Sequence, residues 1–121
     1  MCRRWRLYRY FPPAERLIAG RETRLDDLAD VLGSLEMIPV PVPADCRDGF
    51  EAAFWRRPHA YLNPEVRAAM SALALIPEVD RRAGVRALRA DLETGEWQQR
   101  WGHLLRCDEL DLGYRVIIAH C

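Results

Sequence analysis

Five side chains that could bind a small polar substrate lie close together in this sequence: Asp45, Cys46, Trp55, Arg57 and Tyr61. A guanidinium group binds carboxylates and phosphates through paired, charge-assisted hydrogen bonds. Arg57, close to Trp55 in the chain, is therefore suited to holding an anionic group against an aromatic surface. Arginines near the end of a helix are also ordinary solvated charges, and the residues alone leave both interpretations open.

The candidate ligands for a metal are scattered, so the sequence predicts no metal site. The cysteines and histidines show neither a CxxC pair nor zinc-type spacing: Cys2, Cys46, Cys107, Cys121, His59, His103 and His120. Cys46 could act as a nucleophile with a distant histidine, but a half-buried structural cysteine is the commoner role. No catalytic residue is assigned.

The glycines lack the spacing of a loop that cradles phosphates or a dinucleotide. None is followed by another two or three residues later: Gly20, Gly33, Gly49, Gly84, Gly95, Gly102 and Gly113. Neither GxGxxG nor a P-loop can be drawn. We therefore expect no cofactor-binding residues in this chain.

The composition is that of a neutral globular chain. Eighteen acidic and eighteen basic residues cancel, and half of the 121 residues are hydrophobic, enough for a core. A neutral chain gives no general support for binding nucleic acid or a membrane surface. Residues 1–11 mix arginines with aromatics, which fits either a basic arm or an ordinary packed segment. Scattered cysteines without a signal peptide predict free thiols in the cytoplasm.

Helices should supply most of the scaffold that positions these residues. Hydrophobic spacing with cap, proline and glycine punctuation predicts helices over about 12–21, 23–32, 64–76 and 78–94. Asp48 is a plausible cap for a short helix that ends before Pro58, and a further helical turn carries Trp97 and Trp101.

The remaining regular structure should be two strands. Pro39, Pro41 and Pro43 alternate with valines, so their missing N–H groups lie on one side of a strand over about 37–42, which must be an edge strand. The continuous apolar run at about 114–119 predicts a strand buried on both faces. Because two strands alone are marginal, the complete sheet should be larger than these residues supply.

Four motifs in the sequence resemble a known family. They are PVPADCRDGF at 41–50, WRRP at 55–58, YLNP at 61–64 and DELDLGYR at 108–115. From about Trp5 onward the chain resembles the C-terminal half of class I S-adenosylmethionine-dependent methyltransferases, most closely the bacterial branch called methyltransferase type 11.

The resemblance implies an α/β fold, here a single partial domain over 1–121 from a Rossmann-like methyltransferase. That part would be mostly helical, with an antiparallel pair of strands at about 37–42 and 114–119. In the family, the last strand lies inside the sheet and the preceding strand at its edge. The intervening helices cap the substrate side. Asp45, Cys46, Trp55, Arg57 and Tyr61 would then line or gate the pocket of the methyl acceptor.

The family's glycine-rich loop and ribose-binding acid belong to an N-terminal half that this sequence lacks. S-adenosylmethionine is thus expected for the whole enzyme, while this chain alone should neither bind it nor be active. The expected partners are the missing half or a self-association partner, and a small-molecule acceptor; no nucleic acid, membrane or metal is expected. The alternative is a non-enzymatic interaction domain that pairs through its sheet edge.

Overall fold

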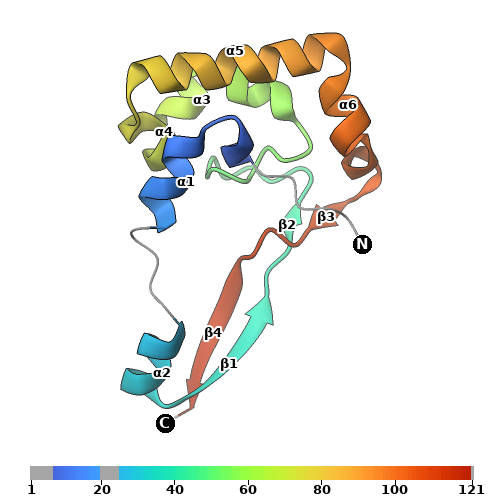
Figure 1. The fold of residues 1–121 in the computed structure, drawn as a ribbon. Helices are drawn as coiled ribbons and strands as arrows, with labels where there is room; N and C mark the ends of the chain where they lie inside the picture. The colour runs from blue at the N-terminus through green and yellow to red at the C-terminus, as the bar shows by residue number, and fades with distance from the viewer. Residues whose placement is uncertain (1–6, 20–24, 121) are drawn as a thin grey trace.

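The computed structural model describes residues 7–19 and 25–120, which form a layer of helices with a two-stranded ribbon reaching away from it (Figure 1). The helices and strands follow in the order η1 (Leu7–Arg9), α1 (Pro12–Ala19), α2 (Leu25–Leu32), β1 (Ser34–Pro39), β2 (Val42–Pro43), η2 (Pro58–Leu62), α3 (Pro64–Ala68), α4 (Ser71–Leu75), α5 (Glu78–Thr94), α6 (Glu96–Trp101), η3 (Gly102–Arg106), β3 (Glu109–Leu110) and β4 (Arg115–His120). The predicted boundaries near Arg21 and Thr23, and most of the basic-aromatic segment, lie outside the described residues.

Local capping defines the helices that the sequence predicted best. The side chain of Asn63 accepts a hydrogen bond from the backbone N–H of Glu65 at 2.9 Å, with Pro64 in the first position of α3. Helix α5 starts after Pro77 and stops at Gly95, whose φ of 86° only glycine adopts readily.

The predicted helix over 64–76 is broken into α3 and α4. Met70 between them has an extended backbone and a side chain that is 1% exposed. At the break, Glu51 Oε1 accepts a hydrogen bond from the backbone N–H of Ala72 at 3.2 Å, in the first turn of α4. A distant carboxylate therefore stabilises an interruption that the helical pattern does not reveal.

The short helix predicted after Asp48 is absent, and residues 51–56 form consecutive turns instead. Tertiary partners hold this segment: the hydroxyl of Tyr61 accepts from the backbone N–H of Phe54, a donor that a helix would use, and the indole Nε1 of Trp55 donates to the carbonyl of Val42. A helix this short has little stability of its own in water, so these contacts decide its conformation.

A single hydrophobic core lies beneath α5. Its largest fully buried side chains come from every part of the helical layer: Phe11, Trp55, Tyr61, Met70, Leu73, Leu88 and Leu104. The ring of Phe11 and the carbonyl of Tyr10 come so close to Gly84 that a Cβ there would lie under 3.0 Å from them. Glycine at this position lets α5 rest directly on the segment before α1.

The strands pair antiparallel, as predicted, with boundaries shifted by a few residues. Strand β1 pairs with β4, with Ile38 opposite Val116, and β2 pairs with β3, with Val42 opposite Leu110. The N–H groups of Val40 and Ala44 donate across the ribbon to the carbonyls of Tyr114 and Asp108, respectively. Because these donors alternate with the three prolines, the prolines lie on the outer edge.

The predicted burial of 114–119 on both faces is wrong for this chain by itself. Val116 is 49% exposed and Ile117 37% exposed, although they point to opposite faces of the ribbon. Ile38 and Met37, their partners on β1, are also exposed. The apolar run remains uncovered because none of the described helices lies across either face of the ribbon (Figure 1).

Three tyrosines, two buried and one half-buried, should keep their protons well above the ordinary pKa of about 10. Burial is the main reason that the pKa values of Tyr8, Tyr10 and Tyr61 are raised, and a hydrogen bond to Asp91 raises that of Tyr10 further. Folding favours the neutral phenols, so their contribution to stability is present below pH of about 10 and is lost as the pH rises beyond it.

An alkaline titration followed by the ultraviolet absorbance of tyrosinate should therefore show delayed ionisation in the folded chain. Tyrosinate should appear together with the loss of secondary structure, measured by circular dichroism on the same samples. The chain in denaturant is the control and should titrate near pH of about 10. Ordinary ionisation of all tyrosines in a chain that remains folded would contradict the buried placement.

Candidate functional site

Arg57 stabilises the loop of residues 44–57, which carries most of the candidate site. Its Nη2 atom donates to the carbonyl of Cys46 at 2.7 Å and to that of Ala53 at 3.3 Å. The guanidinium carbon lies 4.8 Å from the centre of the Phe54 ring, a cation–π distance. Of the three nitrogen atoms of the Arg57 guanidinium, only Nη2 has hydrogen-bond partners among the described residues. Because the side chain is exposed, its Nη1 and Nε donors are available to a ligand.

Trp55 and Tyr61 lie beneath the loop, in the core. They are 1% and 0% exposed, and their polar atoms bind backbone: Trp55 Nε1 donates to Val42 at 3.0 Å, and the Tyr61 hydroxyl donates to the carbonyl of Glu51 at 2.7 Å. In this arrangement the two side chains support the loop from below. That they also touch an acceptor stays a prediction.

Asp45 and Cys46 occupy the outer part of the same loop. Asp45 is exposed and Cys46 half-buried. The thiol makes only a long contact, 3.9 Å, with the carbonyl of Asp48. The structure thus brings Asp45, Cys46 and Arg57 together at the surface of residues 44–57. Their role in binding an acceptor likewise stays a prediction.

Glu51, which is not among the predicted site residues, connects three parts of the chain through hydrogen bonds. Its Oε2 accepts a hydrogen bond from the Tyr8 hydroxyl at 3.3 Å, its Oε1 one from Ala72, and its carbonyl one from Tyr61. Tyr8 and Ala72 are far from Glu51 in sequence, so no local pattern could have revealed this role. Through these contacts the loop is held against η1 and α4.

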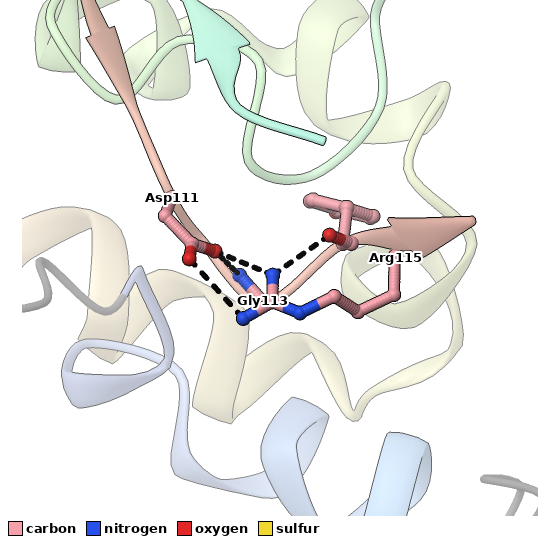
Figure 2. Close-up of polar contacts among 4 residues, drawn as sticks. Asp111, Gly113 and Arg115 are labelled. Carbon is pink, nitrogen blue, oxygen red and sulfur yellow. Dashed lines mark hydrogen bonds and ion pairs between the residues drawn. The ribbon is translucent and has the colours of Figure 1, made fainter. Parts of the chain in front are cut away.

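Residues 111–114 bulge out of the ribbon opposite residues 40–41, and hydrogen bonds to Asp111 stabilise the bulge (Figure 2). Asp111 Oδ1 accepts from the backbone N–H of Gly113 at 3.0 Å and from Arg115 Nη1 at 2.7 Å, while Oδ2 accepts from Arg115 Nη2 at 3.1 Å. Gly113 has a φ of 98°, where other residues are strained. The bulge places Tyr114 edge-on against Phe50, with ring centres 5.2 Å apart.

The described residues do not fit a cofactor or a metal ion. No three potential ligands among histidines, cysteines and acids are grouped for a metal within residues 7–19 and 25–120. The glycines with positive φ in that part end a helix (Gly33), join α5 to α6 (Gly95) or lie in the bulge (Gly113), so none stands between a strand and the helix that follows it, as in a dinucleotide-binding loop. No described helix is long and apolar enough to cross a bilayer.

No protein-family model matches the chain, and no curated protein matches it. Its fold and sequence are similar to the crystal structure of a protein from Anabaena variabilis ATCC 29413, described as a "putative methyltransferase from antibiotic biosynthesis pathway". The TM-score is 0.87 and the identity 38%, over 100% of this chain and 51% of that one. The chain thus matches part of the fold of that protein and is similar to it in sequence, spanning about half of its length.

Proposed function

We propose that the chain is the acceptor-side portion of a bacterial, cytoplasmic S-adenosylmethionine-dependent methyltransferase, and that it is inactive without the cofactor-binding half. The similarity to half of the Anabaena protein, at 38% identity across this whole chain, carries the proposal. The exposed ribbon supports it independently, because its surface suits a strand pair at the edge of a larger sheet whose two faces are covered.

Both faces of the ribbon are apolar, which is typical of a strand pair covered on two sides. Met37 and Ile117 share one face, and Ile38 and Val116 the other; all four are at least 37% exposed. Soluble proteins rarely leave contiguous apolar surface of this kind open unless something covers it. A cofactor-binding half would supply helices for both faces and a strand for the edge.

Strand β4, not β1, offers the edge for that strand. Prolines remove donors from the outer edge of β1. The carbonyl of Tyr114 accepts a hydrogen bond from Val40 and therefore points toward β1. Because the backbone groups of successive residues point to opposite edges of a strand, the N–H groups of Arg115, Ile117 and Ala119 point away from β1. A neighbouring strand of the cofactor half would pair with these donors.

Within such an enzyme, the 44–57 loop would position the acceptor, with the free donors of Arg57 holding an anionic or polar group on it. Class I methyltransferases gain most of their rate from placing the acceptor in line with the methyl group. Since the described residues form no cofactor site, no step of the transfer itself is assigned to them.

The test joins this chain to the half of the Anabaena protein that it does not match and compares it with the chain alone by titration calorimetry with S-adenosylmethionine. The chain alone should give no saturable binding, and the joined protein should bind. Hydrogen exchange at Ile117 and Ala119 should be fast in the chain alone and slow in the joined protein.

Matched lysine variants make the test specific. Ile117→Lys on the ribbon should abolish cofactor binding by the joined protein while changing the stability of the chain alone by at most about 0.5 kcal/mol, as for an exposed position. Val79→Lys, at a 73% exposed position on α5, should leave binding unchanged. Micromolar binding by the chain alone would refute the proposal.

The exposed ribbon also fits the alternative of an interaction domain that associates with another chain through its edge. The same experiments separate the two functions. Self-association that Ile117→Lys abolishes, together with a joined protein that never binds S-adenosylmethionine, would favour the interaction domain.

A further inference from the structure

A basic groove follows the first half of α5. Helix α5 lies at the opposite end of the molecule from the β1–β4 ribbon (Figure 1). The groove has a volume of about 320 Å³ and is lined by Glu78 and Val85 and by five arginines, Arg67, Arg81, Arg82, Arg86 and Arg89. In a chain with equal numbers of acidic and basic residues, this is a marked local excess of positive charge.

Two of the five arginines are held in place by backbone carbonyls. Arg67, from α3, donates from Nη1 to the carbonyl of Tyr61 at 2.9 Å, and Arg81 donates from Nη1 to that of Leu73 at 3.2 Å. These bonds orient the two side chains, and neither guanidinium group forms an ion pair with a residue in the described ranges 7–19 and 25–120. The site is therefore partly organised before any ligand arrives.

The protein does little to neutralise the groove. Arg82 pairs with Glu78 at 3.0 Å, but both side chains are mostly exposed, and such pairs contribute little. Arg86 and Arg89 form no ion pair with any described residue. Burial lowers the pKa of Arg67, and the charges of Arg81 and Arg89 lower it further, as expected where like charges are crowded.

Arg67 also has a donor that the described residues leave unsatisfied. Its Nε atom is buried without a hydrogen-bond partner, which is uncommon for a buried polar atom. A row of solvated arginines along α5 would explain the exposed members of the groove. It does not explain why a residue from α3 converges on them with a buried, unpaired N–H.

We propose that this groove binds a small molecule carrying a phosphate or diphosphate group. Several guanidinium groups on two elements match the multiple acceptor oxygens and close negative charges of such a group. The proposal does not depend on methyl transfer, because the groove and the ribbon are separate features.

Sodium diphosphate is the probe, titrated into the chain by calorimetry with inorganic phosphate and sulfate in parallel. Diphosphate should bind saturably and more tightly than either smaller anion. The double variant Arg86→Gln/Arg89→Gln removes two cations without described partners and should weaken binding about ten- to a hundred-fold. Circular dichroism should show both variant and parent folded.

The double variant Arg16→Gln/Arg106→Gln is the matched control, since it removes two exposed arginines outside the groove. It should change diphosphate affinity by less than about two-fold. Equal weakening by both double variants would show binding to net charge alone and overturn the proposal. Failure of diphosphate to saturate the chain by about 1 mM would also overturn it.

Discussion

Replacing Gly84 by alanine should destabilise the chain by roughly 2 kcal/mol or more, although alanine is the better helix former by about 1 kcal/mol. A Cβ at this position would lie under 3.0 Å from the Tyr10 carbonyl and the fully buried Phe11 ring. Neither neighbour can yield cheaply, because one is backbone and the other is enclosed by the core. Denaturant unfolding of both chains would measure the change.

Ala87→Gly is the internal control for this prediction. Ala87 is exposed in the same helix, so the substitution should cost about 1 kcal/mol through helix propensity alone. If Gly84→Ala instead raised the free energy of unfolding, α5 could not rest directly on residues 10–11. The position of α5 determines where Arg81 and Arg89 meet Arg67, so the result also bears on the basic groove.

Trp55→Ala should have a larger effect, a loss of about 3–5 kcal/mol. The side chain is 1% exposed, and its Nε1 donates to Val42 at the point where the ribbon meets the helical layer. Since a domain of this size has about 5–15 kcal/mol of stability in total, the variant should be largely unfolded at modest denaturant concentrations. Circular dichroism against denaturant would measure it.

Trp55→Phe separates packing from hydrogen bonding at the same position. It keeps much of the buried ring but removes the indole hydrogen bond to the carbonyl of Val42, and should cost about 1–3 kcal/mol. A Trp55→Ala chain as stable as the parent would show that this residue is not a core element. It would then strengthen the hypothesis that Trp55 lines the acceptor pocket.

Local pattern alone predicted the features that depend on neighbouring residues. The punctuation around α5, from Pro77 to Gly95, needs no distant partner. The alternation of Pro39, Pro41 and Pro43 assigned the outer edge of the ribbon, because strand geometry converts parity in sequence into direction in space. The antiparallel pairing of the two strands followed from the family resemblance and is confirmed.

The tertiary structure decided whatever depends on residues far apart in the chain. Glu51 interrupts the helix at Met70, and Tyr61 and Val42 hold residues 51–56 in turns, although local periodicity favoured helices in both places. Short helices have little stability of their own in water, so a hydrogen bond to a group from a distant segment is enough to favour another backbone conformation.

The candidate site divides in the same way. The sequence identified Asp45, Cys46, Trp55, Arg57 and Tyr61 by residue type, but only the fold separates the surface residues of the 44–57 loop from the two aromatics in the core beneath it. Arg67 joins the α5 arginines only because α3 folds against α5. The chemical type of a residue can be read directly from the sequence. The burial of a side chain, and its meeting with residues from distant segments, depend on long-range packing, which local sequence patterns do not reveal.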